Sequence, residues 1–437
     1  RARAAMKAHD LRLAGDLAIL ADLPPTRFTG YNNLEGQAHV VALFDAAHRR
    51  VKQLTGEGFV LLDRTPFYAL SGGQVGDTGQ LRFEGGHAEV LDCTAPAQKR
   101  HLHKVVVTGS LLENTSVNAL VHPIRRRRVR AHHTATHLLH AALREVLGTH
   151  VKQAGSVVDA ARLRFDFTHF APLEPAQIAE IERLASRQAL KSVDTQVREM
   201  DIEEALSSGA MALFGEKYGD VVRVVQVPGF STELCGGTHV PNTGEIGVVK
   251  IISEGAVAAG VRRIEAVAGE MALELLQADE AMIQGLSRQA NASREALPEL
   301  LAARDHRIAQ LERDLKDAKL KAAGGGGSAE QVEQVKGITL VTALIEGLEG
   351  NALREFMDQV RTRHTSAVIV LASKTAEDKV TALVSVSPDL AHDAGALFKT
   401  MLPALNGRGG GKKDLAQGGG TNPSGLPEAL SALRAAL

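Results

Sequence analysis

The central part of this chain is organised around His133-Thr134-Ala135-Thr136-His137, which is matched much later by Cys235-Gly236-Gly237-Thr238-His239. Each stretch places two possible metal ligands four positions apart. Apolar residues in 132–147 recur at helical spacing, and residues four apart share a helix face, so both imidazoles of the first stretch can point at one ion. The paired glycines of the second stretch predict a tight turn that joins thiolate and imidazole. Three histidines and a cysteine suit Zn²⁺.

Length and composition indicate a folded protein of several domains. The 437 residues allow roughly two to four domains, and a hydrophobic content of 44% argues against wholesale disorder. The net charge of −1 leaves any nucleic-acid contact to local basic patches. Two cysteines cannot form a disulfide framework, and neither a signal peptide nor a membrane-length apolar stretch is visible, so a cytoplasmic protein is expected. Because the chain starts with Arg rather than Met, we expect a piece of a longer protein.

The order of the expected elements predicts an α+β protein of several domains. A helical pattern stops at Pro24-Pro25, and short β-type runs then suggest a small barrel or sandwich. Helices and strands alternate around the ligand stretches and again near the C-terminus. The predicted parts are an N-terminal helix (1–27), a β-barrel-like domain (28–121), an α+β domain with the ligand stretches (122–268), a helical hairpin or coiled coil (269–323), a Gly-rich linker (324–336) and a small α/β domain (337–437).

The predicted helical segment carries apolar residues at near-heptad spacing. Leu301, Ile308, Leu311 and Leu315 mark this stripe. It is explained either by packing on the body of the protein, which is the more common case, or by a seam between two chains. A homodimer through residues 269–323 or through the C-terminal domain is therefore one possible assembly.

Two further stretches allow a structural or a functional interpretation. The glycine-rich residues 71–79 form either a tight turn between strands or a loop whose backbone approaches a ligand. The arginines of 125–128, with Arg130, form either a solvated helix entrance or a contact for a phosphate backbone near the ligand stretches.

The stretch 407–420 places seven glycines around a charged centre. Its lysines do not follow the spacing of a P-loop, and its glycines do not form a dinucleotide-binding fingerprint. Exposed amides beside Arg408, Lys412 and Lys413 would form an anion site suited to RNA phosphates or stacked bases. The alternative is a disordered linker.

Together these stretches resemble the editing and C-terminal domains of alanyl-tRNA synthetases. The resemblance rests on SGGQVGDTG (71–79), HTATH (133–137), LRFDF (163–167), CGGTH (235–239) and the glycine-rich 407–420, and it covers nearly the whole chain in the family's order. It implies that the aminoacylation domain is missing, because no class II activating motif is found here. The free-standing long form of the alanine-type trans-editing factor shares these elements and stays an alternative.

The resemblance implies an aminoacyl-tRNA deacylase that removes serine or glycine from tRNA(Ala). A pocket for alanine cannot exclude glycine and rejects an added hydroxyl only by something like 10²-fold, so a second site must remove the error. By the family pattern, one Zn²⁺ is held by His133, His137, Cys235 and His239. Substrate-positioning roles are implied for Gln153, Gly72, Gly73 and Gln74. Contacts with tRNA are implied for Arg125, Arg126, Arg408, Gly409, Gly410, Lys412, Lys413 and Gln417.

The implied mechanism meets one chemical difficulty. Four protein donors are typical of structural zinc, whereas catalytic zinc keeps a coordination position open. We therefore favour a zinc that positions the aminoacyl end. Two other interpretations are an RNA-binding module with structural zinc and a metallohydrolase of a small ester or amide. The C-terminal domain also resembles one in DHH-type phosphoesterases, but no Asp-His-His motif supports that chemistry.

Overall fold

The computed structural model describes residues 20, 22–97, 99–212, 219–325, 330–348 and 350–437. They belong to two compact units, Arg1–Ile283 and Gln284–Leu437, and each is described by itself. The α+β class with several domains is confirmed. The helix predicted for 1–27 lies almost entirely outside the described residues, although Leu20 is buried against Ala42 and Phe44.

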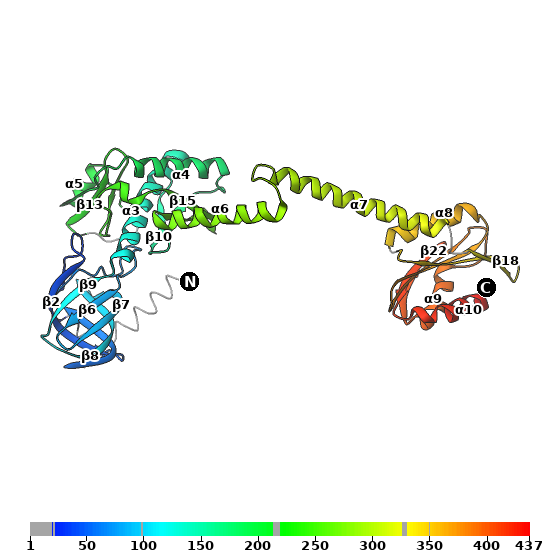
Figure 1. The fold of residues 1–437 in the computed structure, drawn as a ribbon, viewed down its shortest axis with the longest axis horizontal. Helices are drawn as coiled ribbons and strands as arrows, with labels where there is room; N and C mark the ends of the chain where they lie inside the picture. The colour runs from blue at the N-terminus through cyan, green and yellow to red at the C-terminus, as the bar shows by residue number, and fades with distance from the viewer. Residues whose placement is uncertain (1–19, 21, 98, 213–218, 326–329, 349) are drawn as a thin grey trace. The chain divides into compact units, whose positions relative to one another are not determined.

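A closed β-barrel forms the first part of the chain. Its strands are β2 (Glu35–Asp45), β4 (Gln53–Leu62), β6 (Gly79–Phe83), β7 (Gly86–Ala97), β8 (Arg100–Leu112) and β9 (Ser116–Val121). The short strand β3 (Arg50–Val51) pairs onto β2, and β1 (Arg27–Phe28) and β5 (Arg64–Thr65) form a separate parallel pair. The sheet runs β2-β4-β8-β7-β6-β9, and β9 pairs back onto β2, which leaves no open edge (Figure 1). Alternate residues fill the interior, as Val117, Ala119 and Val121 do in β9. Because the sheet closes on itself, this part is a barrel and not the sandwich that the sequence also allowed.

The α+β part of the first unit presents the ligand stretches. Its elements are α3 (Pro123–Leu147), β10 (Gln153–Val158), β11 (Leu163–Thr168), α4 (Pro175–Leu190), β12 (Gln196–Asp201), α5 (Ile202–Ser207), β13 (Val221–Val227), β14 (Ser231–Leu234), η1 (Thr243–Ile246), β15 (Val249–Ala258) and β16 (Val261–Ala268). The sheet β10-β11-β16-β15 packs its apolar side chains against α3 and α4. A smaller sheet, β12-β13-β14, ends directly before Cys235.

Local sequence explains where the ligand helix begins and ends. Pro123 supplies the preset φ of a first helical turn, and the His122 side chain accepts a hydrogen bond from the backbone N–H of Arg125. Gly148 ends the helix at a φ of 112°. Most of α3 is buried, because the sheet, α4 and the barrel side each contact part of it.

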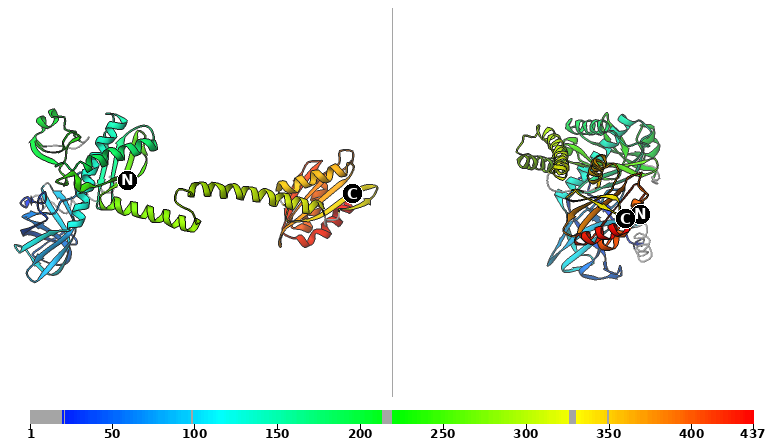
Figure 2. Two further views of the ribbon diagram at one scale, coloured as in Figure 1. Left: turned by 45° about the horizontal axis from the view of Figure 1, so that its top comes forward. Right: turned by 90° about the vertical axis from the view of Figure 1, so that its right-hand side faces the viewer.

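The second unit is built on a mixed sheet with helices on both faces (Figure 2). Its elements are α7 (Leu297–Gly325), β17 (Gln331–Val335), β18 (Ile338–Glu346), α8 (Gly350–Arg363), β19 (Val368–Ala376), β20 (Lys379–Val386), α9 (Ala394–Leu405), β21 (Gly407–Gly411), β22 (Leu415–Gly420), η2 (Pro423–Gly425) and α10 (Leu426–Ala436). The strand order is β17-β18-β19-β20-β22-β21. Helix α8 covers one face, and α9 with α10 cover the other. Helix α6 (Glu270–Ala290) spans the boundary between the units.

The predicted linker 324–336 is largely regular structure where it is described. Helix α7 continues through Gly325, and β17 forms a hairpin with β18. Lys336 and Gly337 make the turn at φ values of 50° and 88°. The strand was missed because its short polar stretch carries a weak hydrophobic signal, whereas pairing with β18 supplies its hydrogen bonds.

The glycine-rich stretch 407–420 is a β-hairpin, neither an irregular loop nor a linker. Strands β21 and β22 pair from Gly407↔Gly420 to Gly411↔Ala416. Helix α9 lies so close that a Cβ at Gly409 or Gly418 would sit 2.6 or 2.7 Å from Phe398 Cε1. These two glycines therefore have a packing reason that needs no ligand.

The near-heptad stripe of α7 stays exposed in the structure. Leu301, Ile308, Leu311 and Leu315 all belong to it, and pairing with a second chain remains a prediction. Among the residues described, no helix combines the length and the apolar character needed to cross a membrane.

Candidate metal centre

Four side chains able to ligate a metal meet between α3 and the turn after β14. Cys235 Sγ lies 3.4 Å from His133 Nε2 and 3.3 Å from His239 Nε2. With His137, one ligand atom from each residue lies within 4.8 Å of all the others. The histidines are buried and Cys235 is half-buried. This cluster could hold one metal ion.

Gln74 fixes the ring of His133. Its Oε1 lies 2.8 Å from His133 Nδ1 and accepts a hydrogen bond from the backbone N–H of Thr238 at 2.9 Å, while its Nε2 donates to Thr238 Oγ1 at 2.9 Å. Because Oε1 is an acceptor, His133 carries its proton on Nδ1 and keeps the Nε2 lone pair for a metal. Gln74 is fully buried. The Gln74 side chain therefore orients a candidate metal ligand, and its implied role in positioning the substrate stays a prediction.

Thr134 fixes the ring of His239 in the way that Gln74 fixes the ring of His133. Its hydroxyl donates to the Arg130 carbonyl at 3.1 Å and lies 3.1 Å from His239 Nδ1. Since its proton is already used, the hydroxyl accepts from Nδ1 and leaves Nε2 free toward Cys235. The ligand helix thus supports the ligand turn directly.

Gly237 allows His133 to reach this position. A Cβ on Gly237 would lie 2.0 Å from His133 Cε1 and 3.0 Å from Gln74 Oε1, whereas a Cβ on Gly236 would meet no atom within 4 Å. Of the two glycines in the turn, only Gly237 is required by a close contact.

Burial keeps the imidazoles in their ligating form. It lowers the pKa of His133, His137 and His239, and the neighbouring histidines and Arg223 lower the pKa of His133 and His239 further. Neutral imidazoles keep a lone pair, which is the state that binds a metal.

A cleft of about 270 Å³ opens beside the cluster. Gln153 of β10 and Gly72 line it, together with His133, His137 and Cys235. Gly73 does not line it; its carbonyl accepts from the Val158 N–H at 2.8 Å, and a Cβ there would lie 2.5 Å from the Ser156 carbonyl oxygen. The structure therefore brings Gln153 and Gly72 to the cleft and gives Gly73 a packing role.

Glu233 is a cleft residue that the sequence analysis missed. Its buried carboxylate accepts from Ser231 Oγ at 3.1 Å, lies 3.2 Å from His140 Nδ1 and is 3.8 Å from His137 Nε2. Burial raises the pKa of Glu233, but His137 and His140 outweigh burial, and the pKa falls below its usual value. A charged residue on the inward-facing side of β14, two positions before a ligand, was the signal that could have found it.

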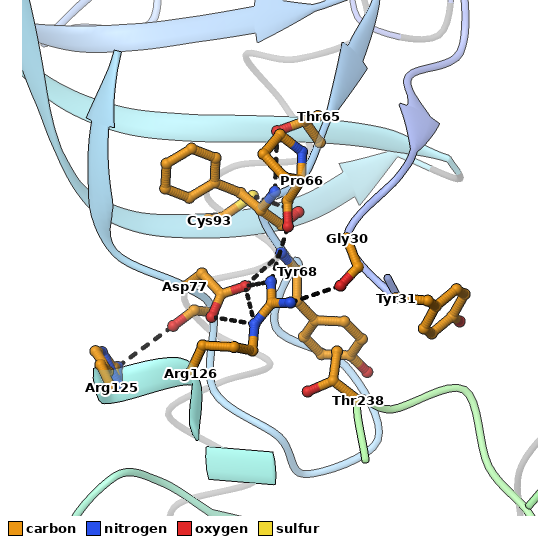
Figure 3. Close-up of polar contacts among 12 residues, drawn as sticks. Gly30, Tyr31, Thr65, Pro66, Tyr68, Asp77, Cys93, Arg125, Arg126 and Thr238 are labelled. Atoms are coloured by element: carbon orange, nitrogen blue, oxygen red, sulfur yellow. Dashed lines mark hydrogen bonds and ion pairs between the residues drawn. The ribbon is translucent and has the colours of Figure 1, made fainter. Parts of the chain in front are cut away.

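Arg126 is a structural residue, which corrects its expected role as a tRNA contact (Figure 3). Its guanidinium is 1% exposed and pairs with the buried Asp77 carboxylate, with Nε 3.0 Å from both carboxylate oxygens. Its Nη1 donates to the Gly30 carbonyl at 2.6 Å and its Nη2 to the Pro66 carbonyl at 2.8 Å. These partners tie the start of α3 to the barrel and leave nothing of Arg126 for a phosphate.

The other arginines of this run differ in exposure and partners. Arg125 is half-buried and donates to the Gly76 carbonyl at 3.3 Å. Arg127 and Arg128 pair with Glu270 of α6. A tRNA contact through Arg125 remains a prediction.

The predicted tRNA-binding residues of the C-terminal domain lie on one hairpin. Arg408 is exposed on β21, and Lys412 and Lys413 occupy the exposed turn between β21 and β22. Gln417 accepts from Arg354 Nε of α8 at 2.7 Å. A Cβ on Gly410 would meet no atom within 4 Å, in contrast to one on Gly409. Arg408, Gly410 and Gln417 thus alternate with the residues that face α9.

Three family models match parts of the chain. They are described as tRNA synthetases class II (A) over residues 1–125, Threonyl and Alanyl tRNA synthetase second additional domain over 222–265, and DHHA1 domain over 337–437. An alanine–tRNA ligase of Acidithiobacillus ferridurans is 44% identical over 97% of this chain and 49% of its own length. One of Aromatoleum aromaticum is 43% identical over 99% of this chain and 50% of its own length.

The chain belongs to the alanyl-tRNA synthetase family. It spans about half the length of the curated relatives it matches. A solved C-Ala domain of Aquifex aeolicus alanyl-tRNA synthetase is 34% identical, with 24% of this chain and 95% of that domain covered at a TM-score of 0.23.

Different matched segments contain different groups of the candidate residues. The second additional domain match holds Cys235 and His239, and the DHHA1 match holds the whole β21–β22 hairpin. The class II match covers the barrel, a part that the sequence analysis had linked to the family only through residues 71–79.

Proposed function

We propose that this chain is the editing part of an alanyl-tRNA synthetase and hydrolyses seryl- or glycyl-tRNA(Ala). The observation that carries the proposal is the metal-ligand cluster forming one wall of a cleft that Gln153 and Glu233 also line. An ester between an amino acid and a ribose needs such a wall to hold the carbonyl, and a polar group to orient it. The same pattern in a free-standing trans-editing factor would give the same chemistry.

Zn²⁺ is the metal that we propose for the cluster. Tetrahedral zinc with usual bond lengths places sulfur and nitrogen donors about 3.5 Å apart. The Cys235 Sγ distances to His133 Nε2 and His239 Nε2 are 3.4 and 3.3 Å. When bound, zinc supplies Lewis-acid polarisation of a carbonyl or of water.

The chain's own residues would orient the ester and accept a proton. Gln153 offers an amide donor and acceptor to the substrate from β10. Among the described residues that line the cleft, Glu233 alone carries a carboxylate. Its lowered pKa keeps it ionised, so it can accept a proton, although it is a weaker base than an ordinary glutamate.

Deacylation of Ser-tRNA(Ala) and Gly-tRNA(Ala) by the 437-residue chain tests this function. We expect hydrolysis well above the rate in buffer, with Ala-tRNA(Ala) spared. Gln153→Ala should slow it by up to roughly 100-fold, because loss of orientation at the reacting group costs that much. Gln196→Ala, an exposed glutamine on β12, is the matched control. Equal rates for Gln153→Ala and the wild type would remove Gln153 from the substrate site.

A structural metal in an RNA-binding module is a second candidate function. Four protein donors favour it, because they fill a tetrahedral shell. In that case, metal removal would unfold the α+β part without a separate effect on hydrolysis.

We further propose that the β21–β22 hairpin binds tRNA. Support comes from the exposed Lys412, Lys413 and Arg408 on a domain that matches the DHHA1 model. Lys412→Ala/Lys413→Ala should weaken tRNA binding and reduce the salt dependence of log Kd by about 0.7 to 0.9 for each phosphate that is no longer neutralised. Lys399→Ala, an exposed lysine on α9, controls for the removal of positive charge. A salt slope like that of the wild type would contradict the assignment.

A further inference from the structure

The metal-ligand turn is held through its backbone carbonyls by two residues outside it. Arg223 Nη1 of β13 donates to the Cys235 carbonyl at 2.8 Å and to the Gly237 carbonyl at 2.8 Å. The carbonyl between them, of Gly236, accepts from the Tyr31 hydroxyl at 2.9 Å. Three successive carbonyls of the turn thus have donors from elsewhere. Since two of the three residues are glycines without side chains, the turn has little packing of its own to fix its shape.

Tyr31 is itself held in place from several sides. The Arg223 guanidinium carbon lies 4.1 Å from the centre of the Tyr31 ring, a cation–π geometry. The Phe28 ring of β1 meets the Tyr31 ring edge-on at 4.8 Å between centres. Arg130 Nη2 donates to the Tyr31 carbonyl at 2.7 Å. A hydroxyl this constrained gives the Gly236 carbonyl a fixed donor.

These contacts connect both halves of the metal centre. Arg126 and Arg130 hold the backbone of Gly30 and Tyr31, and both arginines belong to α3, the helix that carries His133 and His137. Tyr31 in turn holds the turn that carries Cys235 and His239. The segment between β1 and β2 therefore lies between the ligand helix and the ligand turn.

We infer that Tyr31 and Arg223 are positioning residues of the metal centre, and that the barrel segment around Tyr31 sets the placement of Cys235. The inference rests on the proposed metal binding. It assigns to the barrel a role in the chemistry of a site whose ligands all lie outside the barrel. Outer residues that orient metal ligands change affinity by roughly 10- to 100-fold when they are removed.

Zinc affinity of the full chain, measured by competition with a chromophoric chelator, tests this inference. Tyr31→Phe removes only the hydroxyl and keeps the ring beneath Arg223, and it should weaken Zn²⁺ binding about tenfold. Arg223→Lys keeps the charge but cannot hold two carbonyls and stack on the ring, and it should weaken binding by about 10- to 100-fold. Two variants should bind as the wild type does. Tyr68→Phe removes a hydroxyl that donates to the Ser71 carbonyl, and Arg198→Ala removes an exposed arginine of β12.

The unfolding midpoint of the metal-free proteins separates positioning from support of the fold. We expect metal-free Tyr31→Phe to stay folded with a midpoint near that of the wild type, so that its weaker binding reports on the centre alone. If Arg223→Lys unfolds, Tyr31→Phe decides the question. Zn²⁺ affinity of folded Tyr31→Phe within twofold of the wild type would overturn the inference.

Deacylation by the wild type is measured separately. A wild type that binds Zn²⁺ without hydrolysing Ser-tRNA(Ala) would refute the proposed activity and leave the affinity comparison to decide this inference.

Discussion

Cys235→Ala should lose both the metal and the deacylation of Ser-tRNA(Ala). The Cys235 Sγ lies 3.4 Å from His133 Nε2 and 3.3 Å from His239 Nε2. Without it, three nitrogen donors and a gap remain, and zinc affinity should fall at least roughly 100-fold, beyond the effect of changing an outer residue. We expect less than about a tenth of the zinc to be retained, and deacylation to fall by a similar factor. Zinc content and hydrolysis measured on the same preparation check both results.

The other cysteine supplies the matched control. Cys93 is buried in the barrel core, far along the chain from the ligand stretches, so Cys93→Ala should keep its zinc and its activity at the cost of about 1 kcal/mol of stability. A folded Cys235→Ala protein that loses zinc and still hydrolyses Ser-tRNA(Ala) would contradict the proposed role of the metal. If neither form hydrolyses the substrate while both bind tRNA, the chain is an RNA-binding module with a structural metal.

Arg126→Ala should lower the free energy of unfolding by about 3 to 5 kcal/mol. The substitution leaves the Asp77 carboxylate, 2% exposed, without its cation, and it removes the donors to the Gly30 and Pro66 carbonyls. Breaking a buried ion pair by removing one partner costs much more than the pair contributes to stability, because an uncompensated charge stays buried. Denaturant unfolding measured on the metal-free protein checks the change.

Arg127→Ala is the matched control, one position along the same helix. Arg127 is 55% exposed and pairs with Glu270, itself 46% exposed, so its removal should change stability by about 0 to 1 kcal/mol. An Arg126→Ala protein as stable as Arg127→Ala would show that the buried pair does not hold the barrel to α3. At a temperature where the Arg126→Ala protein is folded, its tRNA affinity should equal that of the wild type.

The C-terminal hairpin shows that a glycine-rich stretch can have a structural explanation that its sequence does not reveal. The sequence singled out 407–420 for its glycines and its charges, and it offered only a binding loop or a linker. In the structure, Phe398 of α9 lies too close to Gly409 and Gly418 for either to carry a side chain. Gly410 has free space around it, and Arg408 and the two lysines are exposed. Glycines that admit a helix and glycines that admit a ligand look the same in a sequence.

Local sequence was enough to predict which four side chains form the cluster that could hold a metal, and the helix and turn that present them. His133 and His137 share a helix face because the spacing of residues along a helix is a local property. The paired glycines before Thr238 predict a turn because the backbone freedom of glycine is also local. The family and the α+β class also followed from motifs and element order. These features depend on residues that are close together in the chain.

Tertiary packing, in contrast, selected which polar residues serve the centre and which hold the fold. Arg126 and Arg127 are neighbours of identical chemistry, and only packing buries one against Asp77 and exposes the other. Gln74 and Tyr31 meet the ligand stretches across long sequence separations. No local pattern records such contacts, because burial and pairing depend on the surfaces that distant segments bring together when the chain folds.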